Sequence, residues 1–253
     1  MAATAIIRAI HLCKTYSTGT EQHHAIRNVD LDLYEGDFTV IMGNSGSGKS
    51  TLLYLLSGLD TVTAGEVWYR DERIDRYDER RLSEFRNRQI GYVYQSINLV
   101  PDLSFQDNIA LPGYIARQPA AEVERRARAL MQELEIDGQR HRLPAQTSGG
   151  QQQRAAIARA LINEPDLLFA DEPTGSLNYE HGQAVLDILT RLNRRGQSIV
   201  MVTHDIKAAC RAERLIYIRD GKVSGSLTFD KYGADDERER EETIFAFISG
   251  REA

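Results

Sequence analysis

The sequence predicts an α/β fold in which helices cover a largely parallel sheet. Short apolar segments alternate with helix-forming segments through the second half of the chain, an order typical of parallel strands joined by helices. An apolar strand at 38–42 runs directly into a glycine-rich loop and a helical segment. Two further segments, 6–12 and 26–33, indicate β structure near the N-terminus.

The remaining elements follow from apolar periodicity and from the glycines that interrupt it. Further strands are expected at 66–69, 90–94, 167–170, 198–203 and 214–218. Helices are expected at 49–57, 120–134, 151–162 and 182–193. The segment 70–88 alternates in charge, which indicates a solvated face.

Composition disfavours several classes of protein. The 253 residues are 42% hydrophobic and 27% charged, which is ordinary for a globular protein. No apolar run approaches the roughly 20 residues that span a bilayer. Residues 1–14 do not resemble a signal peptide, so we expect any membrane role to be peripheral. The net charge of −6 argues against a nucleic-acid partner, and Cys13 and Cys210 have no metal-binding spacing.

A phosphate-binding loop (P-loop) is predicted at 43–50, where Gly-Asn-Ser-Gly-Ser-Gly-Lys-Ser matches the pattern G-x-x-x-x-G-K-[ST]. The glycines let successive backbone N–H groups turn toward phosphate oxygens, and the following helix N-terminus adds partial positive charge. Lys49 is expected to reach the β- and γ-phosphates, and the Ser50 hydroxyl to bind Mg²⁺. The candidate nucleotide-binding residues are Gly43, Asn44, Ser45, Gly46, Ser47, Gly48, Lys49, Ser50 and Thr51.

Two carboxylates follow the apolar strand 167–170. Asp171 is placed to hold Mg²⁺, directly or through water. Glu172 can polarise an attacking water as general base. Alone, this segment would indicate a solvated acidic turn, but beside a P-loop it predicts nucleotide hydrolysis.

The segment Ser-Gly-Gly-Gln-Gln-Gln-Arg at 148–154 resembles the signature motif of ABC ATPases. A hydroxyl and two glycines immediately before a helix also form an anion cradle. The resemblance implies that Ser148, Gly149, Gly150 and Gln151 face the γ-phosphate held by the P-loop of a second protomer. It therefore implies an ATP-bound homodimer.

Three more residues resemble functional positions of the same family. Gln95 resembles the Q-loop glutamine, which approaches Mg²⁺ and water and senses the permease. His204 resembles the switch histidine that contacts the γ-phosphate. Tyr16 stands where the family has an aromatic that stacks on adenine, although a core tyrosine is the alternative. The histidines that match no family position, and are expected to be surface or structural residues, are His11, His23, His24, His141 and His181.

Two residues depart from the family pattern. Thr147 replaces the usual leucine at the start of the signature, where we expect little effect on catalysis. Asn178 replaces the aspartate that usually ends the D-loop, so the side chain keeps its hydrogen-bonding capacity and loses its charge. This second departure bears on communication across the dimer.

The resemblance extends over about 6–223 and implies a P-loop NTPase (RecA-like) core, an N-terminal antiparallel β subdomain and a helical signature subdomain. We expect an ABC ATPase domain at 1–229, with the helical subdomain at about 96–165, and an acidic helical tail at 230–253. Ile244, Phe245, Phe247 and Ile248 share one helical face, which we expect to dock on the domain.

The branch that the chain resembles most contains lipoprotein-release, macrolide-export and antimicrobial-peptide-resistance ATPases. The segments that carry this similarity are 41–43, 58–60, 98–101, 108–112, 170–175 and 201–205. The expected function is ATP binding and hydrolysis, with Mg²⁺, to power a transmembrane permease on another chain. The expected location is the cytoplasmic face of the plasma (inner) membrane, peripheral through that permease.

Other ABC ATPases provide alternatives. DNA-repair members insert a long coiled coil or zinc-binding cysteines, and translation factors fuse two ABC domains, neither of which this sequence contains. A regulatory ATPase that acts on a permease-like partner to control cell-wall hydrolases stays open, because the same motifs would serve it.

Overall fold

The computed structural model describes residues 4–252, apart from the side chain of residue 252. The chain forms two compact units, one made of residues up to Asp78 and from Asn193 onward, the other of Glu79–Leu192. The predicted α/β fold, with its antiparallel N-terminal sheet, is confirmed. Within the described residues, no helix combines the length and apolar character needed to cross a membrane.

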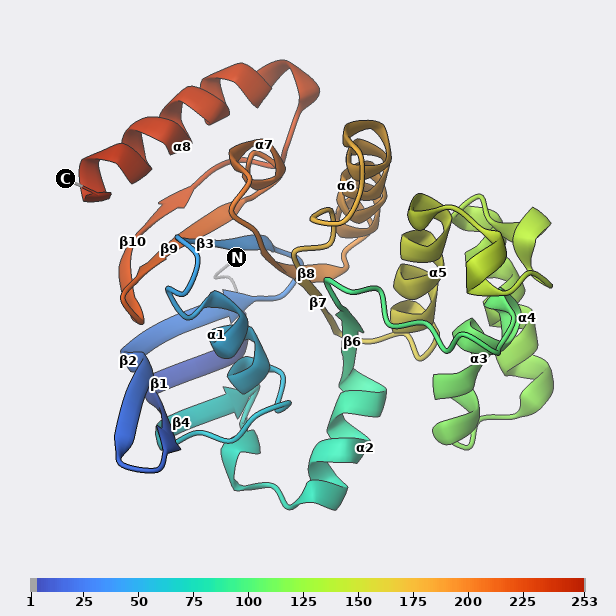
Figure 1. The fold of residues 1–253 in the computed structure, drawn as a ribbon, viewed down its shortest axis with the longest axis horizontal. Coiled ribbons are helices and arrows are strands. Elements are labelled where there is room, and N and C mark those ends of the chain that lie inside the picture. The colour runs from blue at the N-terminus through green and yellow to red at the C-terminus, as the bar shows by residue number, and fades with distance from the viewer. Residues whose placement is uncertain (1–3, 253) are drawn as a thin grey trace. The chain divides into compact units, whose positions relative to one another are not determined.

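The first unit begins with an antiparallel sheet in the order β2-β1-β4-β5 (Figure 1). Its strands are β1 (Ala5–Thr18), β2 (Glu21–Tyr34), β4 (Ala64–Tyr69) and β5 (Glu72–Arg73). The β1–β2 hairpin turns through two residues, and Gly19 supplies the positive φ of 61° that a tight hairpin turn requires. Both strands are longer than the expected 6–12 and 26–33, because their outer ends are polar and exposed.

The same unit contains a second group of strands in the order β10-β9-β3-β8. Strand β3 (Phe38–Met42) pairs in parallel with β8 (Ser198–Val202) on one side and β9 (Arg214–Arg219) on the other. Strand β10 (Lys222–Thr228) pairs antiparallel with β9. Every residue of β3 and β8 is buried, as expected for parallel strands covered on both faces. Helix α1 (Lys49–Leu56) follows β3, and α7 (Ile206–Ala209) follows β8.

The C-terminal helix α8 (Glu237–Glu252) packs against α7 in the first unit. Ile244 is fully buried, and Phe247 and Ile248 are half-buried. The expectation that Phe245 shares this docked face was wrong, since its side chain is 62% exposed. Ile244 and Phe245 are adjacent, so a rotation of about 100° per residue separates them.

The second unit pairs β6 (Ile90–Val93) in parallel with the fully buried β7 (Leu167–Asp171). Its helices are α2 (Glu79–Gln89), α3 (Phe105–Ile115), α4 (Ala120–Glu133) and α5 (Gly149–Leu161), with α6 (Tyr179–Arg194) ending in the first unit. Helices α3, α4 and α5 pack against one another (Figure 1). The segment 70–88, expected only as a solvated face, forms β5 and most of α2, whose Phe85 is buried.

Candidate functional site

The P-loop connects β3 to α1, and its glycines are sterically required. A Cβ atom at Gly43 would lie 2.1 Å from the backbone oxygen of Ile218. A Cβ at Gly48 would lie 2.5 Å from the backbone oxygen of Ala25, and this residue has a φ of 101°. Glycine alone satisfies both the close approach and the left-handed conformation.

Neighbouring backbone fixes the P-loop from the side of the β9–β10 turn. Gly221 N donates to Ser47 O at 3.0 Å, while Arg27 N donates to Gly221 O at 2.8 Å. The loop is therefore tied through one turn residue to strand β2. These two hydrogen bonds fix the position of the P-loop relative to β2.

Two polar side chains of the P-loop are buried and suited to an anion. Lys49 is 6% exposed, and its Nζ donates to Asn44 O at 2.9 Å across the loop. Ser47 is 7% exposed, and its Oγ has no hydrogen-bond partner among residues 4–252. A buried hydroxyl without a partner is costly, and a phosphate oxygen would satisfy it.

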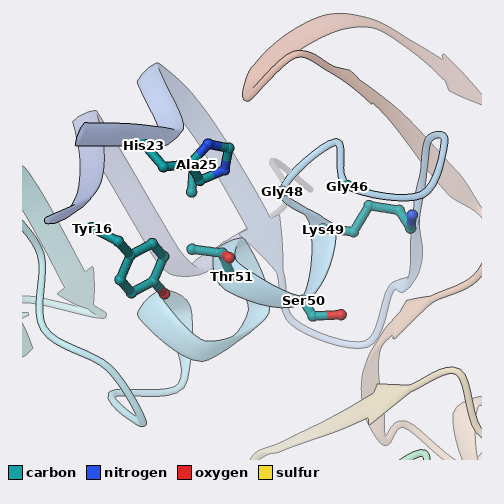
Figure 2. A pocket seen from close by; sticks show the side chains of 8 residues that line it. All are labelled: Tyr16, His23, Ala25, Gly46, Gly48, Lys49, Ser50 and Thr51. Carbon is teal, nitrogen blue, oxygen red and sulfur yellow. The ribbon is translucent and has the colours of Figure 1, made fainter. Parts of the chain in front are cut away.

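A cavity of about 320 Å³ lies over this loop (Figure 2). It is lined by Tyr16, His23, Ala25, Gly46, Gly48, Lys49, Ser50 and Thr51. The structure thus brings Tyr16 together with five of the nine predicted nucleotide-binding residues of the P-loop segment, all within the first unit. The volume is in the range of small-ligand sites.

Tyr16 is held in place by a small polar cluster. Its hydroxyl donates to Asp60 Oδ2 at 2.7 Å, and Lys14 Nζ donates to Asp60 Oδ1 at 2.6 Å and lies 4.8 Å from the Tyr16 ring centre. Burial and the hydrogen bond to Asp60 raise the pKa of Tyr16. Burial also raises the pKa of Asp60, but hydrogen bonds from Lys14 and Tyr16 outweigh it, so the pKa lies below its ordinary value. Tyr16 is 40% exposed, so it is a cavity residue rather than a core tyrosine.

His23 is a cavity residue that the sequence did not reveal. It was expected to be a surface or structural residue, yet it is the register partner of Tyr16 across the β1–β2 hairpin. Directly opposed residues on antiparallel strands share one face of the sheet. Its ring therefore joins that of Tyr16 at the cavity (Figure 2).

His204 follows β8 in the first unit. Thr203 N donates to Ile41 O at 3.2 Å, which ties the end of β8 to β3 just before the P-loop. Asp205 caps α7, since its Oδ1 accepts from Lys207 N at 2.9 Å. Because β3 and β8 run parallel, His204 and the P-loop both follow the carboxyl ends of their strands. His204 is exposed at this edge, where ligands of such sheets bind.

In the second unit, Gln95 and Glu172 lie together. Gln95 Nε2 donates to Glu172 Oε2 at 3.4 Å, because β6 and β7 run parallel and both residues follow the strand ends. Asp171 ends β7 and is 5% exposed. Glu172 has a φ of 44°, unusual for a residue with a side chain and a feature that clusters at functional sites.

The signature segment forms the start of α5. Ser148 Oγ accepts from Gln151 N at 3.3 Å, and Gln151 Oε1 accepts from Ser148 N at 3.1 Å, a reciprocal capping box. A Cβ at Gly150 would lie 2.9 Å from the ring of His181, which gives that histidine a packing role. Because the first N–H groups of a helix lack intrahelical partners, Gly149 and Gly150 can present theirs to an anion.

The structure gives both departures from the family pattern a local role. Thr147 Oγ1 donates to Pro144 O at 2.7 Å, within the turn before α5. Asn178 Oδ1 accepts from His181 N at 3.0 Å, which caps the start of α6. The side chains of Thr147 and Asn178 therefore each form a local hydrogen bond.

A family model described as ABC transporter matches residues 26–175. The chain is 41% identical over 220 residues to an uncharacterized ABC transporter ATP-binding protein of Thermotoga maritima, over 87% of this chain and 94% of that protein. It is 40% identical over 228 residues to the macrolide export ATP-binding/permease protein MacB of Brucella melitensis, over 90% of this chain and 35% of MacB. The chain thus spans about a third of MacB.

Two solved structures of the ATP-binding cassette MJ0796 are similar over their whole length. One, a dimer in a post-hydrolysis state bound to ADP and Pi, has a TM-score of 0.82 and 38% identity. The other, a dimeric structure of the same bacterial ABC transporter cassette, has a TM-score of 0.83 and 39% identity. Each covers 89% of this chain, so about a tenth of the chain has no counterpart in them.

Proposed function

This chain belongs to the ABC transporter family, and from that premise we propose that it is the ATP-binding and ATP-hydrolysing subunit that powers a membrane permease on another chain. The permease is of the export, lipoprotein-release or antimicrobial-peptide-resistance type. The observation that carries the ATP-binding part is the P-loop cavity, which is lined by buried Lys49 and by the exposed ring of Tyr16. The buried Ser47 hydroxyl of the same loop has no hydrogen-bond partner among residues 4–252.

ATP binding uses the two ends of that cavity. The adenine stacks on Tyr16, whose orientation is set by Asp60 and Lys14. The phosphates lie in the P-loop, where Lys49 exchanges the Asn44 carbonyl for phosphate oxygens. Charge-assisted hydrogen bonds to phosphate are roughly twice as strong as neutral ones, which favours this exchange.

The candidate donors fit Mg²⁺. Ser50, Gln95 and Asp171 offer hydroxyl, amide and carboxylate oxygens, the ligand type that this hard cation takes alongside phosphate oxygens. When bound, Mg²⁺ would neutralise charge on the phosphates during transfer.

Hydrolysis relies on side chains that act on the attacking water and the γ-phosphate. Glu172 accepts the proton of that water as it attacks, and Gln95, at 3.4 Å from the same carboxylate, orients the pair. His204 donates a hydrogen bond to the γ-phosphate as its charge develops. Each of these residues follows a buried parallel strand.

A second copy completes each site. The capping box of Ser148 leaves the first N–H groups of α5 available for the γ-phosphate on the partner's P-loop. ATP then joins two copies, and hydrolysis releases them. The similar MJ0796 cassette is dimeric in both structures, which supports this proposal.

The membrane partner follows from the relatives. MacB is named an ATP-binding/permease protein, and this chain matches about a third of it. The chain therefore supplies the ATP-binding part, held peripherally at the cytoplasmic face of the membrane by its permease. Affinity purification from detergent-solubilised membranes tests this point, since the permease should co-purify. A permease-like protein bound to a cell-wall hydrolase would instead favour the regulatory alternative.

Light scattering tests the split site. Glu172→Gln should accumulate a dimer with ATP, because bound ATP persists. Adding Ser148→Arg should abolish that dimer, since a bulky side chain stands where the phosphate must approach, while ATP still binds to the single copy. A double variant that dimerises as well as Glu172→Gln would refute the proposed role of the signature segment.

A further inference from the structure

A buried arginine of α8 donates hydrogen bonds to backbone carbonyls shortly after His204 in the chain. Arg240 is 5% exposed, and its Nη1 donates to Cys210 O at 3.1 Å and Ala212 O at 2.8 Å. Its Nη2 donates to Asp230 O at 2.6 Å. The guanidinium forms no ion pair within the described residues, so backbone carbonyls take the place of a carboxylate.

Aromatic rings enclose the same guanidinium. Its Cζ lies 5.1 Å from the centre of the Phe229 ring and 5.6 Å from that of Tyr232. Tyr232 is itself fixed, because its hydroxyl donates to Glu237 Oε2 at 2.7 Å. A planar guanidinium with aromatic neighbours forms hydrogen bonds of specific geometry. We call Arg240 and the carbonyls of Cys210, Ala212 and Asp230 the clamp. Loss of the side chain would leave these three carbonyls without their donor.

The clamped backbone is rigidly connected to His204. Helix α7 is a single turn, in which Ala209 N donates to Asp205 O and Cys210 N to Ile206 O, both at 3.0 Å. On the other side of His204, Thr203 N donates to Ile41 O. His204 therefore lies between two fixed points, the β3–β8 strand pair and the end of α7 held by Arg240.

The far end of α8 reaches the edge strand β10. Arg251 Nε donates to Ser224 O of β10 at 3.1 Å, and Arg219 of β9 donates to Arg251 O. The β9–β10 turn in turn supplies Gly221 N to Ser47 O of the P-loop. Helix α8 thus contacts α7, which follows His204, and β10, which begins at the turn that bonds to the P-loop (Figure 1).

We propose that Arg240 is a positioning residue for ATP hydrolysis, which fixes α7 on α8 and so holds His204 in the orientation that contacts the γ-phosphate. The proposal rests on the proposed ATPase function. Helix α8 would then contribute to hydrolysis by positioning His204. Nucleotide binding, which depends on the P-loop and Tyr16, does not require the clamp.

Steady-state phosphate release by the full chain tests the proposal. Arg240→Ala should lower kcat about tenfold, because small misplacement of a catalytic group is costly, with KM for MgATP nearly unchanged. Arg240→Lys should recover part of kcat, since an ammonium can still donate to some of the carbonyls. The matched control is Arg238→Ala on the same helix, whose side chain is 92% exposed and pairs with Glu242.

A double-mutant cycle separates positioning from general destabilisation. In a His204→Ala background, Arg240→Ala should lower kcat little further, because the residue it positions is already absent. An equal additional loss in that background would overturn the proposal. Wild-type kcat in Arg240→Ala would overturn it too.

The reactivity of the Cys210 thiol tests the clamp independently of any ATPase measurement. It is buried, its Sγ lies 3.3 Å from Ile206 O and 3.7 Å from Glu237 O, and burial raises its pKa to about 11. In a Cys13→Ser background, a maleimide should label Cys210 slowly in the otherwise wild-type chain and faster in Arg240→Ala. Equal labelling rates would overturn the clamp, whereas an inactive wild-type chain would overturn the proposed ATPase function.

Discussion

The P-loop and the acidic segment 171–172 are held by different kinds of contact. Backbone from β2, β9 and the β9–β10 turn encloses the P-loop and fixes its conformation. Glu172 has an unfavourable φ of 44° and lies at a long 3.4 Å hydrogen bond from Gln95. On the proposed function, nucleotide binding would therefore rest on a loop fixed by backbone contacts, whereas hydrolysis would depend on individual side chains. Changes in the two regions should therefore have separable effects.

The largest separable effect is expected from Glu172→Gln. The amide keeps the size of the side chain and cannot accept a proton, so the rate of phosphate release should fall by about two to four orders of magnitude. ATP affinity should be preserved, because the P-loop is untouched. Phosphate release by the two proteins under saturating MgATP measures the change, and turnover close to wild type would remove Glu172 from the role of base.

Gly43→Ala should instead impair MgATP binding itself. The added methyl would lie 2.1 Å from Ile218 O, so the loop must shift. Overpacking of this kind costs about 1–3 kcal/mol, and we expect both a lower Tm and the loss of stabilisation by MgATP. Gly138→Ala is the control, because no atom lies within 4 Å of its added Cβ. Normal MgATP stabilisation in Gly43→Ala would show that the loop is less constrained than its contacts indicate.

A smaller effect is expected at the adenine end of the cavity. Tyr16→Ala removes the ring and should weaken MgATP binding about tenfold, within the ~1–3 kcal/mol range measured for base stacking on aromatics. Tyr16→Phe keeps the ring and loses the hydroxyl that bonds to Asp60 and Thr51, so its affinity should stay nearer wild type. Calorimetric titration distinguishes the two. Equal losses would assign the contribution to the hydroxyl rather than to stacking.

The smallest effect is expected from Asn178→Asp, which restores the residue that the family usually has. Asparagine and aspartate cap helices about equally, and Asn178 Oδ1 already accepts from His181 N. The free energy of unfolding should therefore change by less than about 0.5 kcal/mol. Urea unfolding measures it, and a larger change would show that the side-chain charge acts on the fold.

Much of this organisation could be predicted from the sequence because the signals are local. Strands 38–42, 167–170 and 198–203 are predominantly apolar segments, and the structure places β3, β7 and β8 within a residue of them. The P-loop is fixed by glycine at defined spacing, and Glu172 directly follows an apolar strand. Such signals are carried by residues that lie close together in the sequence.

Other features depend on tertiary context and were missed. Helix α3 has an internal Pro112 and weak periodicity, and buried Asn108 stabilises it by donating to the carbonyls of Val100, Leu103 and Ser104. Strand β10 alternates exposed and half-buried residues, so it lacks an apolar run. His23 reaches the cavity only through the register of the hairpin, which a linear pattern does not encode.

Binding of MgATP to the preformed P-loop is the central claim, and thermal unfolding tests it most directly. The Tm of the wild-type chain and of Glu172→Gln should rise on addition of MgATP, by the equivalent of about 2.7 kcal/mol at a hundredfold excess over the dissociation constant. The Tm of Lys49→Ala should rise far less, because its buried ammonium is lost. An unchanged wild-type Tm at millimolar MgATP would contradict the account.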